Sequence, residues 1–376
     1  MIYFNNAAES YPKPLAIQEV VRDLPFYENG RNCNCASHSS PAEEFRVKLA
    51  KFLNLPDNYQ VTITNSATES ANIILRSFDK EDLVKFDDRA HNCVVRTCNE
   101  FFKNNYLFHE ANTVFELISG YCLVHQSNVD GSIIDVKQEI EKLKGFYPNL
   151  RAIVVDISQS IGNIDIDVSS WNYDNVYVFG TMHKFMGSIC GCGFICHPKM
   201  NFLKPLITGG TGTISNDYRQ PNQFPNYLES GTKNSLAITC AIKSIDINDK
   251  LLMQLNNNAK TRLVRLYKER FEKSDKDFFD KFFITRNVND SIPYINLIPY
   301  KPVVGDFITT ELHKKNIIVR FGCHCVPFFR FKKDDKKYHE SIRLSFSQFN
   351  FDNEIHTFFD ELSDILVKNY KTLSKL

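Results

Sequence analysis

Three features that mark other classes of protein are missing from this sequence. The 376 residues carry 45 Lys and Arg against 44 Asp and Glu, without the basic excess usual in nucleic-acid-binding proteins. No apolar run approaches the roughly 20 residues that span a membrane. The start, MIYFNNAAES, lacks the basic region and apolar segment of a secretory signal. We therefore expect a cytoplasmic protein with no nucleic-acid and no membrane partner.

The residues that are present suit a globular protein with many thiols. Hydrophobic residues make up 43% and charged residues 24%, and the length allows one large and one smaller domain. Eleven cysteines without a signal peptide predict reduced thiols and no disulfide framework. Six of them form C-x-C pairs, namely Cys33/Cys35, Cys190/Cys192 and Cys323/Cys325. A gap of one residue is shorter than zinc sites use, so we expect no metal.

Apolar, β-branched runs alternate with amphipathic helical stretches through the first two-thirds of the chain. Such runs occupy residues 60–65, 152–158 and 175–180, and a helical pattern follows the first of them at 66–78. This alternation predicts an α/β fold whose largely parallel sheet is covered on both faces. Ligands bind such sheets beyond the carboxyl ends of the strands, which is where the informative polar residues fall.

The last third of the sequence has a different pattern. A long helical pattern around residues 240–275 suggests a connector between two domains, and short strands at 295–300 and 316–321 follow it. A final amphipathic helix begins near residue 350. We predict a large domain at residues 15–240 and a small α+β domain at 241–376, with residues 1–14 packing with the small one.

One lysine stands between a histidine and an aromatic residue just after an apolar run, in FGTMHKFMG. In a cleft the pKa of a lysine falls, and the neutral amine can form a Schiff base with an aldehyde. Taken alone, the stretch fits a surface lysine after a buried strand at least as well.

Three other stretches place polar residues past predicted strand ends. ITNSATES gives a helix N-terminus with the hydroxyls of Ser66 and Thr68, which suits a phosphate or simple capping by Ser66. His91 follows a polar turn, and Asp156 ends an apolar strand with Gln159 three residues later. A carboxylate there needs a cationic partner to stay charged. Each signal by itself is weak.

The order of the short stretches is more specific than any one of them. They are IYFNNAAESYPKP, SATES, AHNCVVR, HQSNVDG, VDISQS, HKFMG, GGTGT, ESGTKN, RFGCHC and SIRLSFSQFN. Through them nearly the whole chain resembles the class V aminotransferase-like group of fold-type I pyridoxal 5'-phosphate (PLP) enzymes, and within it the cysteine desulfurases. The resemblance implies a mostly parallel seven-stranded sheet in the large domain, PLP as cofactor, L-cysteine or a related amino acid as substrate, and a homodimer.

The resemblance also implies roles for single residues. Lys184 matches the lysine that reacts with the PLP aldehyde, and His91 matches the catalytic histidine that stacks over the ring. Asp156 would pair with the pyridine nitrogen and keep the ring an electron sink, and Gln159 would hydrogen-bond the phenolic oxygen. The residues that match the family's phosphate ligands are Ala67, Thr68, Thr181, His183 and, across a dimer interface, Thr232.

The stretch RFGCHC decides between reactions that share PLP. Cys325 matches the desulfurase thiolate that takes sulfur as a persulfide while alanine is released. We expect Arg320, His324 and Arg343 to help stabilise that thiolate. Asn128 and Arg343 match groups that hold the substrate, and an arginine fork suits a carboxylate.

Only 18 residues separate Cys325 from Arg343 (343 − 325). This spacing resembles the selenocysteine lyase-like subgroup, which has a short, ordered catalytic-cysteine segment and needs a sulfur-acceptor protein.

Several positions depart from the family pattern and keep alternatives open. Cys323 stands where the family more often has no thiol, and it would relay sulfur, form a regulatory disulfide or do nothing. The other C-x-C pairs also depart from it. The alternatives are another class V enzyme, such as a selenocysteine lyase, C–S β-lyase or aminotransferase, or a catalytically silent thiol-binding or metal-binding protein on this scaffold.

Overall fold

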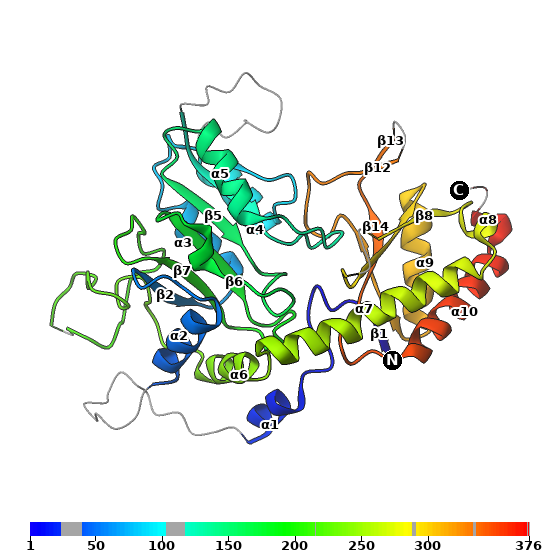
Figure 1. Ribbon diagram of the computed structural model, residues 1–376, viewed down its shortest axis with the longest axis horizontal. Coiled ribbons are helices and arrows are strands. Elements are labelled where there is room, and N and C mark those ends of the chain that lie inside the picture. Colours follow the sequence, from blue (N-terminus) through cyan, green and yellow to red (C-terminus); the bar gives the residue numbers. More distant parts are fainter. Residues whose placement is uncertain are drawn as a thin grey trace. The chain divides into compact units, whose positions relative to one another are not determined.

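The computed structural model describes residues 1–23, 40–102, 117–214, 216–287, 291–333, 336–373 and 375, which fall into two compact units (Figure 1). The α/β unit comprises residues 13–126 and 134–249, and the C-terminal unit comprises residues 1–12, 127–133 and 250–376. Cys33 and Cys35 lie outside the described residues. The units divide at Asp249, and the domain boundary expected at 240 stays a prediction.

A mixed sheet with the strand order β2-β7-β6-β5-β4-β3 forms the centre of the α/β unit. Its strands are β2 (Tyr59–Thr64), β3 (Leu83–Phe86), β4 (Ile118–Val124), β5 (Ala152–Asp156), β6 (Val176–Thr181) and β7 (Gly193–Pro198). Strands β3 to β6 are parallel, whereas β7 is antiparallel to both of its neighbours. The predicted α/β fold is confirmed. Within the described residues the sheet has six strands and not seven, a number that came from the family resemblance and from no pattern in this sequence.

Helices accompany the sheet as the alternating pattern predicts. They are α1 (Leu15–Asp23), α2 (Pro41–Phe52), α3 (Ala67–Leu75), α4 (Asn92–Phe101), α5 (Val136–Phe146), a 3₁₀ turn (Val168–Trp171) and α6 (Ser235–Asp246). Every residue of β5, β6 and β7 is buried, as expected for strands covered on both faces. The three runs that the sequence assigned to strands coincide with β2, β5 and β6.

The sequence pattern predicted one helical connector around residues 240–275. The structure has two helices there, so the prediction of a single helix was wrong. The helix is interrupted for three residues after α6, and the chain then continues as α7 (Lys250–Glu272). The Asn248 side chain donates to the carbonyls of Ser244 at 2.8 Å and Met186 at 3.1 Å. Apolar residues continue on both sides of this break, and Asn-Asp is only a weak signal for the end of a helix.

The C-terminal unit contains an antiparallel sheet with the order β11-β14-β9-β8. Its strands are β8 (Phe283–Arg286), β9 (Tyr294–Pro299), β11 (Arg320–Gly322) and β14 (Ser341–Ser345). Two further pairs are β1 (Ile2–Tyr3) with β10 (Ile317–Ile318), and β12 (Phe331–Lys333) with β13 (Lys336–Tyr338). The helices besides α7 are α8 (Lys276–Phe279), α9 (Pro302–Lys314), α10 (Asp352–Lys368) and α11 (Tyr370–Leu373).

An aromatic core holds the C-terminal unit together where α7 lies alongside α10 (Figure 1). The rings of Tyr267 and Phe359 lie 4.7 Å apart, and both side chains are buried. Such pairs contribute about 0.5–1.5 kcal/mol beyond the area that they bury. None of the helices described here combines the length and the apolarity needed to cross a bilayer.

Two contacts fix the loop after β6, which carries Lys184. Gly162, in the loop after β5, has φ +84°, and a Cβ there would lie 2.8 Å from the carbonyl oxygen of Phe185. On another side, the Lys13 ammonium donates to the carbonyls of His183 at 3.3 Å and Ser188 at 2.7 Å. The conformation of the loop therefore depends on Gly162, which has no side chain, and on the charged side chain of Lys13.

We predict that Gly162→Ala destabilises the α/β unit. Backbone strain together with the clash should cost about 1–3 kcal/mol. Gly145 in α5 is the matched control, since a Cβ there meets no atom within 4 Å and Gly145→Ala should be neutral or stabilising. Differential scanning calorimetry compares the two variants, and an equal change in melting temperature would contradict the packing role of Gly162.

We also predict that Lys13→Met loosens the Lys184 loop without unfolding the unit. Loss of two hydrogen bonds from a charged, partly exposed donor should cost about 1–2 kcal/mol, or roughly 5–30-fold faster local opening. The amides of Gly187 and Ser188, which donate to Lys184 and Met182, report it by hydrogen exchange. Lys13→Arg should restore most protection, and Lys137→Met, at an exposed position of α5, should change nothing. Unchanged exchange in Lys13→Met would remove Lys13 from this role.

Candidate active site

The strand ends of β5 and β6 bring the predicted lysine and carboxylate together. The strands are parallel neighbours, with Asp156 opposite Phe179, so both end at one edge of the sheet. The Asp156 carboxylate is buried and accepts from the Ser158 N–H at 2.8 Å. Burial raises its pKa, while the nearby positive charge of Lys184 and the Ser158 hydrogen bonds oppose the rise. A buried carboxylate of this kind is stabilised by any further cation that reaches it.

His91 is the N-cap residue of α4. Its Nδ1 accepts from the backbone N–H of Cys93 at 3.1 Å and thereby caps the helix. Because Nδ1 is an acceptor, a proton on this ring lies on Nε2. The Cys93 thiol is buried, and its pKa is raised by that burial and by the charge of Asp156, while Lys184 lowers it. Cys93 is thus a neighbour of the site that the sequence did not reveal, since a thiol at a helix start has no distinguishing spacing.

The start of α3 has a geometry that suits an anion. The N–H groups of Ala67 and Thr68 lie in the first helical turn, where no intrahelical acceptor exists, at the positive end of the helix dipole. The Ser66 hydroxyl accepts a hydrogen bond from the Glu69 N–H at 3.1 Å. The prediction that Ser66 caps this helix is therefore confirmed. A Cβ on Gly193 would lie 2.6 Å from the carbonyl carbon of Ser66, so this glycine lets the helix start sit against β7.

The remaining predicted ligands lie around the same strand ends. The hydroxyl of Thr181 lies 2.8 Å from Nδ1 of His183, and it also donates to the Cys192 carbonyl at 3.3 Å. Gln159 is buried in the loop after β5, where its carbonyl accepts from the Asn163 amide at 2.9 Å.

Thr232 is exposed and lines a hollow together with Asn65 and Glu69, at the start of α3 of its own chain. The buried Glu229 anchors this segment, because its carboxylate contacts Arg46 at 2.7 Å and Lys233 at 3.1 Å.

In the C-terminal unit, two arginines lie opposite each other. Arg320 on β11 is the register partner of Arg343 on β14. Like charges placed directly opposite on neighbouring strands repel. The hydrogen bonds described for Arg343 run to neutral acceptors, namely the Asn128 carbonyl and, at 3.0 Å, Oδ1 of Asn5. Burial and the positive charge of Arg320 lower the pKa of Arg343 to about 10, while Tyr294 and Cys325 oppose the shift. This pair would be stabilised by an anion.

Cys325 lies in a tight turn directly after β11. The Val326 N–H donates to the Cys323 carbonyl at 3.0 Å, and φ is positive at both central residues, +53° at His324 and +63° at Cys325. These are the features of a type I′ turn, which residues other than glycine adopt at a cost. Nη2 of Arg320 lies 3.2 Å from Sγ of Cys325. A half-buried thiol with a guanidinium donor is the environment of a nucleophile.

Two buried contacts fix this turn. The Asn128 amide donates to the His324 carbonyl at 2.7 Å, and Nε2 of His324 lies 2.9 Å from the Ser341 hydroxyl. Burial and the charges of Arg343 and Arg320 lower the pKa of His324 well below its usual value, so the ring is neutral. The prediction that His324 stabilises a thiolate was wrong, because a neutral ring held by Ser341 supplies no positive charge.

The predicted residues therefore fall into two groups, one in each unit. The α/β unit contains the residues predicted to bind PLP, which are Ala67, Thr68, His91, Asp156, Gln159, Thr181, His183, Lys184 and Thr232. The C-terminal unit contains Asn128, Cys325 and Arg343, and the structure adds Asn5 as a partner of Arg343. Asn5 lies in the opening motif, where no spacing pointed to an arginine more than 300 residues away.

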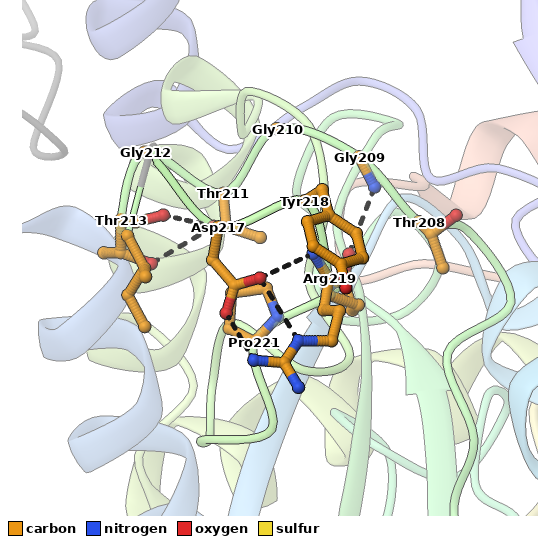
Figure 2. A pocket seen from close by; sticks show the side chains of 12 residues that line it. Thr208, Gly209, Gly210, Thr211, Gly212, Thr213, Asp217, Tyr218, Arg219 and Pro221 are labelled. Carbon is orange, nitrogen blue, oxygen red and sulfur yellow. Dashed lines mark hydrogen bonds and ion pairs between the residues drawn. The ribbon is translucent and has the colours of Figure 1, made fainter.

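A larger hollow lies elsewhere in the α/β unit, within the glycine-rich segment 208–221 (Figure 2). It encloses about 590 Å³, and Asp217 and Arg219 in its lining form an ion pair at 3.3 Å. Most of its lining is exposed, and none of the predicted site residues line it. We therefore do not place the chemistry there.

Comparison with known proteins gives one consistent family. The model of the "Aminotransferase class-V" family matches residues 116–358. A "Cysteine desulfurase" of Wigglesworthia glossinidia brevipalpis is 24% identical and covers 96% of this chain and 92% of its own. "Cysteine desulfurase SufS" of Plasmodium falciparum is 26% identical over 62% of this chain, which spans only 49% of that protein.

A solved structure supports the fold assignment. The apo structure of "Cysteine Desulfurase from Thermococcus onnurineus NA1" has a TM-score of 0.76 at 19% identity, covering 98% of this chain and 95% of its own. The family match spans well over half of the sequence and includes Asp156, Lys184 and Cys325. The chain belongs to the class V aminotransferase family.

Proposed function

We propose that this chain is a PLP-dependent cysteine desulfurase that converts L-cysteine to L-alanine and holds the sulfur as a persulfide on Cys325. The observation that carries the proposal is the donation from Arg320 to Sγ of Cys325 in a strained turn. A hydrogen bond from a cation favours the thiolate, which is the nucleophilic form. The relatives named cysteine desulfurase support the same reaction.

The α/β unit offers a donor set that fits PLP. The buried Asp156 carboxylate, with its raised pKa, suits the protonated ring nitrogen, and Lys184 is the amine nearby. The start of α3 suits the phosphate, with Thr181 and His183 as further ligands. When bound, PLP supplies an electron sink that stabilises negative charge on the substrate carbon. With the cofactor bound, Asp156 would keep the ring nitrogen protonated, and Lys184 would move protons at the substrate.

The two arginines have different proposed roles: Arg343 binds the substrate carboxylate, and Arg320 stabilises the thiolate. Arg343 is buried, and its Nε has no hydrogen-bond partner among the described residues, so this donor would suit the substrate carboxylate. Arg320 stabilises the Cys325 thiolate, which attacks the sulfur of cysteine. An S–S bond forms, the C–S bond breaks, and its electron pair takes a proton at carbon to give alanine.

Partners follow from the same chemistry. Thr232 is exposed, as a ligand offered to the phosphate of a second copy would be, and we propose a homodimer. The persulfide must be discharged, and we propose an acceptor protein in the cytoplasm. Asn128 uses its amide on the turn, so its contribution to substrate binding is through the position of Cys325.

A C–S β-lyase is the closest alternative on this fold. One solved neighbour is titled as a complex of the "cystine C-S lyase C-DES" with cysteine persulfide, at TM-score 0.71 and 15% identity. A lyase or aminotransferase needs no nucleophilic thiol, and so leaves the Arg320–Cys325 contact without a purpose. This contact favours the desulfurase.

We predict that Cys325→Ser retains PLP and binds cysteine but loses sulfur transfer by at least about 100-fold, because a serine hydroxyl is not ionised near neutral pH. Alanine formation and visible absorbance of the bound cofactor are the measurements. Cys196→Ala, which removes a buried thiol from strand β7, should behave as wild type, and Lys184→Ala should lose both signals. Normal alanine formation by Cys325→Ser would reject the desulfurase mechanism.

A further inference from the structure

We propose that Cys323 is a second sulfur carrier, which takes the sulfur atom from the persulfide of Cys325 within the same turn. The inference rests on the proposed function, which supplies the first persulfide. It concerns a position where this chain carries a thiol that the desulfurase reaction itself does not use.

The turn keeps the backbones of the two cysteines close together. Consecutive Cα atoms are about 3.8 Å apart, so those of Cys323 and Cys325 lie less than about 7.6 Å apart in a chain that the turn bends. The bend itself is fixed by the Val326 N–H bond to the Cys323 carbonyl. A persulfide extends the side chain of Cys325 by one S–S bond, about 2.05 Å. Both cysteines are half-buried, so neither is sealed in the core.

The surroundings hold this turn rigid. The Asn128 amide binds the His324 carbonyl between the two cysteines at 2.7 Å, and the His324 ring contacts Ser341 at 2.9 Å. Below the turn, Val326 packs in a small apolar cluster with Val129, Ile298 and Phe331. Two thiols fixed in one turn react as if at high concentration, because little motion is lost when they meet.

The contact with Arg320 selects which sulfur is attacked. If the Cys323 thiolate attacks the outer sulfur of the persulfide, a new S–S bond forms on Cys323 and the old bond to Sγ of Cys325 breaks. The electron pair leaves on Cys325, where Arg320 donates at 3.2 Å. A stabilised leaving thiolate speeds this exchange. Nothing is oxidised or reduced overall, and Cys325 is restored as the nucleophile for another cysteine.

The relay gives each chain two places for sulfur. After transfer, Cys325 accepts sulfur from a second cysteine while Cys323 still holds the first. The holoenzyme should therefore release two alanines per chain in a rapid first phase without reductant, twice the burst of Cys323→Ser. Cys196→Ala, which removes a buried thiol from strand β7, is the matched control for losing one thiol and should keep the burst of two.

Mass spectrometry locates the sulfur directly. Holoenzyme is mixed with excess L-cysteine, quenched with an alkylating reagent and digested with trypsin, which releases residues 321–330 with both cysteines. Fragment ions should show one extra sulfur on each cysteine in wild type and one, on Cys325, in Cys323→Ser.

The other possible results separate a failure of the relay from a failure of the proposed desulfurase reaction. Sulfur on Cys325 alone, with equal bursts in wild type and Cys323→Ser, overturns the relay and leaves the desulfurase intact. A 323–325 disulfide with one sulfide released also overturns it. Absence of both alanine and added sulfur rejects the proposed function itself.

Discussion

Two guanidinium groups lie in register on neighbouring strands of the C-terminal unit, and the chemistry of that unit follows from their repulsion. Arg343 is buried, so its charge is not screened by water, and Arg320 opposite raises the cost of keeping it protonated. An anion lowers that cost, and two anions are at hand in the proposed reaction: the substrate carboxylate and the thiolate of Cys325. A negative charge beside Arg320 would offset the repulsion within the pair, and Sγ of Cys325 lies 3.2 Å from Nη2 of Arg320.

The α/β unit presents the opposite charge problem. Asp156 is a buried carboxylate whose pKa burial raises, and Lys184 only partly offsets the effect. A further cation would stabilise Asp156, because Lys184 does not supply the whole of the opposing charge. The protonated ring nitrogen of the proposed cofactor would be such a cation. In each unit the residues are arranged so that a bound group completes the charge balance, which is a common arrangement in catalytic sites.

The sequence was sufficient to predict the polar residues at the ends of strands as candidates for the site. Asp156 and Lys184 stood out as polar residues at or just past the ends of the apolar runs that form β5 and β6, and their roles came from the family resemblance. Periodicity could not reveal Cys93, Asn5 or Arg320 opposite Arg343, since these depend on a helix start, on a contact across more than 300 residues and on strand register. The break between α6 and α7 was missed because its apolar pattern continues. The neutral state of His324 depends on burial, which the motif RFGCHC does not report.

The products formed from L-cysteine test the central claim most directly, because they reveal where the electron pair of the C–S bond goes. If the Cys325 thiolate removes the sulfur, the pair remains on carbon, and the holoenzyme forms one alanine for each sulfur transferred, with no pyruvate or ammonia. A β-lyase expels sulfide with that pair and yields pyruvate and ammonia. Quantifying alanine, pyruvate and total sulfide in one reaction separates the two. Alanine equal to transferred sulfur is the predicted result, and pyruvate as the main product would contradict it.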